Sequence, residues 1–211
     1  MADYIEVLTR RFRGYPWPSD SWGLTPMYGA DGWCHVCGVP QREQAGPIVL
    51  EAKNFARVIG GWVPNWRFDV YCLEASVAEV ARERFRLGFR NVEWRGTPGG
   101  AAYQVEIPTA EAVWFAPGDL EKILAPIHGE ASKTCDECGV VRWMPVGMDV
   151  LPAPRSDLVA GEPAVIVSSE WFGDGKRSFR QFLWRRDVAE FLVESCSRDF
   201  KLGSVKAFGG A

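Results

Sequence analysis

The chain has 211 residues, of which 47% are hydrophobic and 24% are charged, and its formal net charge is −3. This length allows one large domain or two small ones, and it is enough to bury a core without disulfide staples. The acidic balance argues against a nucleic-acid-binding protein and suits a basic partner. No secretory signal is visible, and no apolar run approaches the ~20 residues of a membrane span. We therefore expect a cytoplasmic protein that makes no use of a membrane.

The first half of the chain predicts short strands and one helix. Residues 14–32 are rich in Pro, Gly and Trp and predict a loop. Ser76 is suited to cap a helix that runs to about residue 87, because Val77, Val80 and Ala81 recur on one face. Apolar or alternating runs predict strands at residues 4–12, 68–73, 89–94 and 103–107, and a strand or short helix at 47–56.

The second half predicts a similar mixture of elements. A turn at residues 117–119 leads into a short helix at 120–124, and Asp187 is suited to cap a helix at 188–197. The polar residues 145–161 predict a long loop. Strands are expected at residues 140–144, 164–168, 178–184 and 205–208.

Two Cys-x-x-Cys-Gly segments are the most informative motifs, Cys34 to Gly38 and Cys135 to Gly139. Two residues between the cysteines let both sulfurs face one ion from a tight turn, and the glycine can adopt the positive φ that turns the chain away. Together the segments supply the four sulfurs of a closed, tetrahedral zinc site. We therefore predict that Cys34, Cys37, Cys135 and Cys138 hold one structural Zn²⁺. Because 97 residues lie between the segments, the ion would join distant parts of the chain.

The two segments belong to a longer internal similarity. Both cysteines of the first segment match those of the second at an offset of 101, and the residues 77–79 and 188–190 share the sequence Val-Ala-Glu at an offset of 111. Each half thus has the order cysteine segment, strand, helix, strand, which predicts an internal duplication. A chance similarity is the alternative, since helices that begin in this way are common.

Two alternatives for the cysteine segments stay open, redox chemistry and a vestigial site that has lost its metal, although all four ligands are present. Trp33 before Cys34 superficially resembles a thioredoxin-type motif, although the Gly-Val-Pro that follows does not favour the helix such a motif opens. A thiol oxidoreductase is therefore a less favoured alternative. Cys72 and Cys196 are isolated in apolar surroundings and are expected to be buried core thiols.

Few other residues indicate chemistry. The two histidines, His35 and His128, are too few to build a catalytic set, and no phosphate-binding glycine loop is present. Asp136 and Glu137 are expected to face solvent, where they could touch a basic partner. The tryptophans in or beside predicted loops can act as binding anchors, although core packing is the commoner role: Trp62, Trp66 and Trp171. We expect no enzymatic activity.

The double occurrence of the Cys-x-x-Cys-Gly motif, with about a hundred residues between the copies, resembles the myxobacterial paralogous double-CXXCG family. Members of that family include immunity proteins paired with toxins that pass between neighbouring cells. The resemblance implies a cytoplasmic antitoxin that binds and blocks a cognate protein toxin, and it assigns no toxin-contacting residue. A zinc-ribbon-like nucleic-acid-binding or regulatory protein is the alternative from another class.

The sequence as a whole predicts a single α+β domain over residues 1–211. It would consist of two pseudo-repeated halves, approximately 1–107 and 108–211, bridged by a four-cysteine zinc site.

Overall fold

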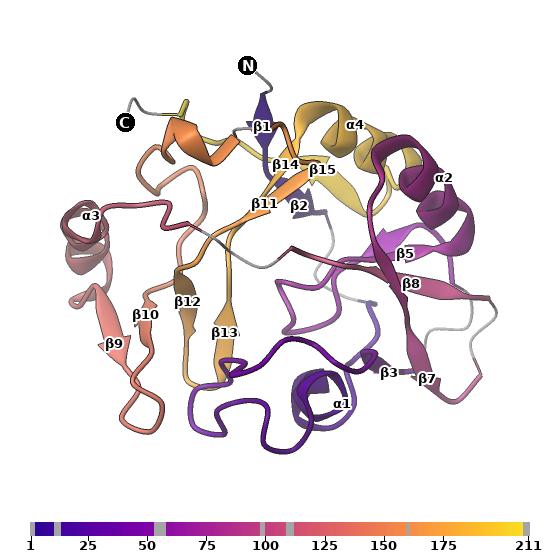
Figure 1. Ribbon diagram of the computed structural model, residues 1–211, viewed down its shortest axis with the longest axis horizontal. Coiled ribbons are helices and arrows are strands. Elements are labelled where there is room, and N and C mark those ends of the chain that lie inside the picture. Colours follow the sequence, from indigo (N-terminus) through magenta and orange to yellow (C-terminus); the bar gives the residue numbers. More distant parts are fainter. Residues whose placement is uncertain are drawn as a thin grey trace.

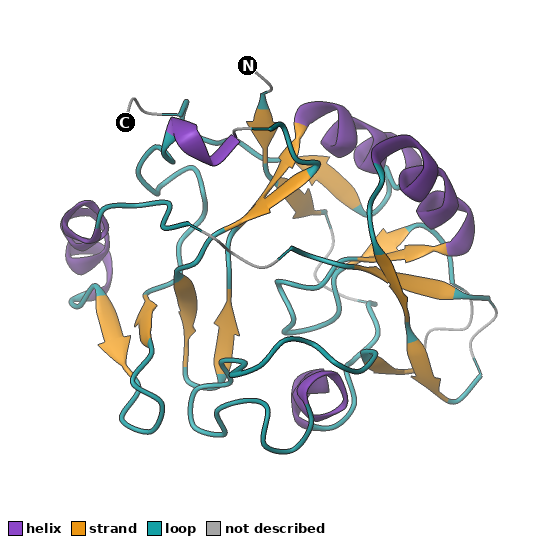
Figure 2. Ribbon diagram, viewed as in Figure 1, coloured by secondary structure: helices purple, strands orange, loops and turns teal. Residues whose placement is uncertain are grey.

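The computed structural model describes residues 3–10, 14–52, 58–97, 100–108, 112–159 and 161–208 (Figure 1). These ranges contain a mixture of helices and short strands, as predicted (Figure 2). The α-helices are α1 (Leu24–Tyr28), α2 (Ala75–Phe85), α3 (Pro117–His128) and α4 (Arg186–Ser195), with 3-10 turns at Ser21–Gly23 and Ser156–Val159. None of the helices in the described ranges combines the length and apolar character needed to cross a bilayer.

The strands are short and belong to five small sheets. The first eight are β1 (Tyr4–Ile5), β2 (Val7–Thr9), β3 (Val49–Glu51), β4 (Gly61–Trp62), β5 (Cys72–Glu74), β6 (Phe89–Asn91), β7 (Glu93–Arg95) and β8 (Ala102–Val105). The remaining seven are β9 (Ser132–Thr134), β10 (Val141–Trp143), β11 (Val165–Val167), β12 (Trp171–Asp174), β13 (Arg177–Phe179), β14 (Phe182–Arg185) and β15 (Phe200–Leu202).

The first strand–helix–strand unit runs from β5 through α2 to β6. In its sheet, of order β4-β5-β8-β6, strand β8 lies between β5 and β6 and is antiparallel to both. Helix α2 covers this sheet because Val77, Ala78, Ala81 and Phe85 form a buried stripe at helical spacing.

The second unit runs from β14 through α4 to β15, and its middle strand comes from the start of the sequence. Strand β1 pairs antiparallel with β14, and β2 pairs antiparallel with β15. The N-terminal segment thus takes the place that β8 occupies in the first unit, and Glu6 interrupts it between β1 and β2. Residues 4–9 therefore pair with strands that lie more than 170 residues further along the chain.

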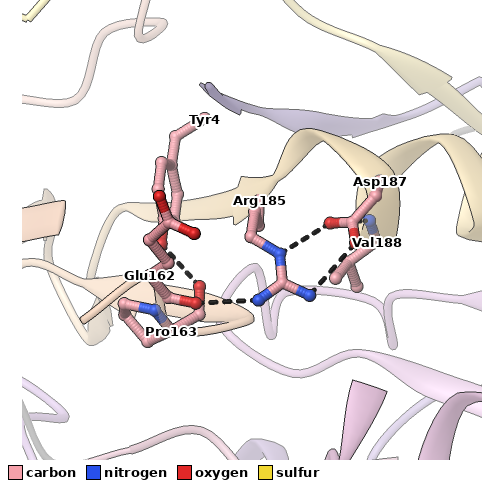
Figure 3. Close-up of polar contacts among 6 residues, drawn as sticks. All are labelled: Tyr4, Glu162, Pro163, Arg185, Asp187 and Val188. Atoms are coloured by element: carbon pink, nitrogen blue, oxygen red, sulfur yellow. Dashed lines mark hydrogen bonds and ion pairs between the residues drawn. The ribbon is translucent and has the colours of Figure 1, made fainter. Parts of the chain in front are cut away.

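Side-chain contacts fix the start of the sequence on this second unit (Figure 3). The Tyr4 hydroxyl donates a 2.6 Å hydrogen bond to the carbonyl of Pro163. Arg185, at the end of β14, donates from Nε and Nη2 to the Asp187 carboxylate at 2.7 and 3.1 Å, and from Nη1 to the Glu162 carbonyl at 2.8 Å. These hydrogen bonds from the Arg185 guanidinium lower the pKa of Asp187.

The two units share one core. Helices α2 and α4 lie side by side (Figure 1), with the rings of Phe85 and Phe191 5.3 Å apart. Beneath them, the Tyr71 ring packs against Trp184 at 5.2 Å and Phe200 at 6.0 Å, and its hydroxyl donates to the Val7 carbonyl at 2.9 Å. Each large apolar side chain buried here contributes roughly 1.5–3 kcal/mol, so this cluster accounts for much of the cohesion between the units.

Several predicted elements need correction. Residues 24–28 form a helix inside the predicted loop, because Leu24 and Met27 are buried on one face. Helix α3 begins at Pro117 and continues to His128, well beyond the predicted 120–124. The predicted strand 178–184 is two strands separated at residues 180–181, and the last strand is Phe200–Leu202 and not 205–208.

The predicted caps were also wrong in detail. Helix α2 begins at Ala75 with Glu74 as its N-cap, and α4 begins at Arg186 with Arg185 as its N-cap. Asp187 still binds the helix start, since its carboxylate accepts a 2.9 Å hydrogen bond from the N–H of Val188. Parts of the predicted elements at residues 11–12 and 53–56 lie outside the described residues.

Candidate metal centre

Both Cys-x-x-Cys-Gly segments fold into the same turn. The N–H of the first cysteine donates to the carbonyl five residues on, from Cys34 to Val39 at 2.8 Å and from Cys135 to Val140 at 3.0 Å. The N–H of the closing glycine donates back to the first cysteine, at 2.7 Å in the first segment and 2.8 Å in the second. The two closing glycines have φ angles of 78° and 71°. The positive φ expected from the sequence is therefore present in both turns.

The structure brings the two turns together. The sulfurs of Cys34 and Cys135 are 3.7 Å apart, and those of Cys37 and Cys138 are 3.6 Å apart. All four sulfurs lie within 4.8 Å of one another, and three of the four cysteines are buried. The clustering predicted for these four residues is thus observed, in an arrangement that could hold a metal ion.

The spacing of the sulfurs suits a tetrahedral metal centre. Zinc–sulfur bonds of about 2.3 Å arranged tetrahedrally place neighbouring sulfurs about 3.8 Å apart, which is close to the two shortest separations. A disulfide requires a sulfur–sulfur distance of about 2.05 Å. All six cysteines of the chain are free thiols. The donor set of four soft sulfurs is one that Zn²⁺ takes in closed sites.

The thiols need a cation if they are to ionise together. Hydrogen bonds from the backbone of Cys138 and Glu137 lower the pKa of Cys135 to about 7. Burial raises the pKa of Cys37 and of Cys138. Four negative charges at these distances would repel one another strongly, and a divalent ion is the group that offsets them.

The first turn is also held by the hairpin of β12 and β13. The buried hydroxyl of Ser178 donates a 2.7 Å hydrogen bond to the carbonyl of Cys37. Gly38 lies so close to the carbonyl oxygen of Lys176 that a Cβ at this position would collide with it. No such neighbour surrounds Gly139, which has open space at the same position of the second turn.

A buried arginine accompanies this hairpin. Arg142, on β10, is 6% exposed, and its guanidinium donates to the Gly175 carbonyl and, at 3.4 Å, to Ser178. Its Nε has no hydrogen-bond partner, and among the described residues no carboxylate pairs with it. A buried cation needs a counter-charge. Four thiolates around one divalent ion would carry a net charge of −2, and Arg142 is linked to the Cys37 carbonyl by two hydrogen bonds through Ser178, so such a centre would suit this arginine.

The remaining residues singled out from the sequence lie elsewhere. His35 is exposed, stacks on Trp33 at 4.0 Å, and has Nε2 2.7 Å from the Ala30 carbonyl. His128 ends α3. As predicted, Asp136 and Glu137 are exposed, and the other two cysteines are buried away from the cluster, Cys72 and Cys196.

Sequence reasoning missed Ser178 and Arg142, which support the first turn through hydrogen bonds. Trp171 was singled out only as a candidate binding anchor or core residue, and it packs against the cysteine cluster together with Val39 and Val140. None of them belongs to a motif, because their role depends on which strands come together.

A groove of about 760 Å³ with aromatic walls is a second feature of the surface. Three large aromatic side chains that line it are unusually exposed, Trp17 at 49%, Trp66 at 40% and Phe68 at 46%. Trp66 also has a φ of 66°, which side-chain-bearing residues rarely adopt. Trp66, one of the three tryptophans singled out from the sequence, is thus exposed, whereas Trp62 is buried.

Comparisons of the chain with protein-family models, with curated proteins and with solved structures find no match.

Proposed function

We propose that this chain is an immunity protein that binds a cognate protein toxin in the cytoplasm and blocks it, with one structural zinc ion holding the binding scaffold together. The observation that carries the proposal is the meeting of the two Cys-x-x-Cys-Gly turns in one four-sulfur cluster. The double motif is the feature that resembles the double-CXXCG family, whose members include immunity proteins, and its two copies belong to a single site. Four thiolates also fill the coordination shell of zinc, as in sites that stabilise a fold.

We further infer that the two halves arose by duplication. An offset of 111 residues carries the start of β6 at Phe89 onto the start of β15 at Phe200, and it carries Ala75, the first residue of α2, onto Arg186, the first residue of α4. The middle strand is the exception, since it follows the helix in one unit and precedes the whole unit in the other. The cysteine turns agree in every backbone hydrogen bond described above.

The aromatic groove supports a protein-binding role. Exposed tryptophan and phenylalanine side chains on a concave, largely apolar surface have the composition of binding hot spots. The Arg177 guanidinium lies 4.5 Å from the Trp66 ring, and Phe68 packs edge-on against Phe179 at 5.5 Å. These contacts hold the rings in place before a partner arrives, which lowers the entropic cost of binding.

The proposal is tested by co-expressing the chain with the product of the adjacent reading frame. We expect a one-to-one complex by size-exclusion chromatography with light scattering, and protection of cells that produce the toxin. Failure of both, or salt-dependent binding to nucleic acid in their place, would overturn the proposal.

The binding face is tested by the double variant Trp66→Ala, Phe68→Ala. If the groove holds the toxin, affinity should fall at least about thirtyfold, as for hot-spot residues worth 2 kcal/mol or more. Ile127→Ala is the matched control, because Ile127 is 55% exposed and lies on α3, outside the groove.

A further inference from the structure

A second concave region lies between the two halves of the chain. This cleft has a volume of about 900 Å³. Its lining includes residues 40–44, 86–88, 90, 104 and 106–108, and, from later in the chain, residues 163–165 with Trp171, Arg180 and Phe182. Its size is in the range of small-molecule sites, which are about 300–1,000 Å³. We call it the interhalf cleft.

The interhalf cleft is rich in arginine although the whole chain is acidic. Its lining includes four arginines, Arg42, Arg86, Arg90 and Arg180. It also includes three carboxylates, of which two are already engaged. Glu106 lies 3.5 Å from Arg90, and Asp69 forms a 2.9 Å ion pair with Arg67, which is buried behind the wall.

The other three arginines keep their charge uncompensated. Among the described residues, Arg42, Arg86 and Arg180 form no ion pair, and only Glu43 remains as an unpaired carboxylate in the lining. The positive charge of the cleft is therefore in excess, while the chain as a whole has a net charge of −3. Concave surfaces with low-dielectric walls strengthen such a local field.

Arg180 is the best placed of these arginines. Its guanidinium lies 5.2 Å from the centre of the Trp171 ring, and its buried Nε has no hydrogen-bond partner. The stacking fixes the plane of the guanidinium and leaves its N–H groups for another acceptor. Because this Nε is shut off from solvent, an acceptor in the cleft would bind the terminal N–H groups of the guanidinium.

The phenol of Tyr28, which also lines the cleft, lies in the same electrostatic field. Burial raises its pKa, and the charges that act on it are Arg67, Arg180 and Arg90 against the single carboxylate of Asp69. Two guanidinium groups that line the cleft, Arg180 and Arg90, thus act on this phenol together with the buried Arg67, and one carboxylate opposes them.

We propose that the interhalf cleft binds a small organic anion with a phosphate or carboxylate group, and that Arg180 holds that group. The fork of a guanidinium matches the oxygens of either anion. The apolar side chains of Met27, Leu87 and Phe182 line the same cleft and would contact the organic part. This site is separate from the aromatic groove proposed for the toxin, although Arg180 and Phe182 border both.

Trp171 connects the interhalf cleft to the cysteine cluster. Its side chain packs against the cluster, and the Arg180 guanidinium lies 5.2 Å from the centre of its ring. Removing the metal should therefore loosen the support on which Arg180 rests, and anion binding should weaken together with metal loss.

The test is a titration of the zinc-loaded, full-length protein with inorganic phosphate, pyrophosphate, ATP, citrate and benzoate at constant ionic strength. Nuclear magnetic resonance of the Trp171 indole N–H and the Arg180 Nε–H reports binding. We expect saturable shifts of both signals with at least one probe, and the preferred probe distinguishes phosphate from carboxylate recognition. Arg180→Gln should weaken that binding about tenfold, the loss expected for a charge-assisted hydrogen bond.

Arg177→Gln is the control, because Arg177 also stacks on a tryptophan but does not line the interhalf cleft. It should bind the anion as the wild type does. Arg42→Gln and Arg86→Gln, at exposed positions, should each weaken binding several-fold and cover the case in which Arg180→Gln does not fold. The proposal is overturned if no probe gives saturable shifts at millimolar concentration, or if Arg177→Gln weakens binding as much as the cleft variants.

Discussion

The hydroxyl of Ser178 donates a hydrogen bond to the carbonyl of Cys37 across 141 residues of sequence, at 2.7 Å. This contact attaches the first cysteine turn to the hairpin of the second half, independently of any metal. In the same hairpin, the carbonyl of Lys176 packs closely against Gly38, and the carbonyl of Gly175 accepts a hydrogen bond from Arg142. The two halves are therefore joined at the centre by protein contacts that position the sulfurs before an ion binds.

Loss of one cluster thiol is expected to remove the metal. Cys37→Ser should lower bound zinc from about one per chain to near zero and destabilise the fold by several kcal/mol, because metal binding and folding are coupled. Elemental analysis and thermal unfolding measure both effects. Cys72→Ala is the control, since Cys72 is fully buried but lies outside the cluster. Full metal content in Cys37→Ser would contradict the four-sulfur site.

The two closing glycines should differ in their tolerance of alanine. Gly139→Ala meets only the cost of a positive φ, roughly 1–2 kcal/mol. Gly38→Ala meets that cost and a collision with the Lys176 carbonyl, so it should lose a further 1–3 kcal/mol or so. Chemical denaturation of the two variants measures the difference. Equal losses would mean that the hairpin does not approach the first turn as closely as described.

Ser178→Ala should weaken the attachment of the first turn. It leaves the buried Cys37 carbonyl without this donor, which costs about 1–3 kcal/mol, and it should speed the release of zinc to a chelator. A colorimetric chelator measures the release rate. Ser76→Ala serves as the comparison, because Ser76 is exposed and its hydroxyl donates to Glu74, the N-cap of its own helix, at 3.2 Å.

Glu6 should make stability depend on pH. Burial and the nearby Asp149 raise the pKa of this carboxyl from 4.5 to about 7. The folded state then holds a proton that the unfolded state releases, so stability is greatest below pH 4.5 and falls as pH rises toward about 7. Glu6→Gln removes the penalty, and it should stabilise the protein by about 1–3 kcal/mol near pH 8 while having little effect near pH 4.

Denaturant titrations at the two pH values check the Glu6 prediction. Glu121→Gln, at an exposed position on α3, reports the generic effect of the same substitution. A Glu6→Gln variant that gains equally at both pH values would show that the carboxyl keeps its ordinary acidity.

Local patterns in the sequence predicted those elements that depend on residues close together in the chain. The paired Cys-x-x-Cys-Gly motifs identified all four sulfurs that cluster, and helical spacing identified α2 and α4. Helix α1 was missed because Pro26 looks like a helix breaker. It stands at the third helical position, where its missing N–H would have no helical partner.

Features that depend on long-range contacts left no such signal. The apolar residues predicted at 205–208 are partly buried, since Val205 and Phe208 pack against a core cluster. Among the described residues, however, no strand pairs with them. Arg142, Ser178 and Arg180 acquire their roles only from the strands that fold beside them. The pairing of β1 and β2 with strands near the far end of the sequence likewise depends on long-range contacts and leaves no local pattern.

That pairing has a consequence for the order of events during synthesis. Residues 4–9 have no ladder partner until the ribosome has made residues 182–202, whereas both cysteine turns have all their residues once residue 140 has emerged. Because chains fold as they are made, the four proposed zinc ligands are available in the nascent protein while its earliest strand is still unpaired. We therefore expect the pairing of residues 4–9 with β14 and β15 to be a late step of folding.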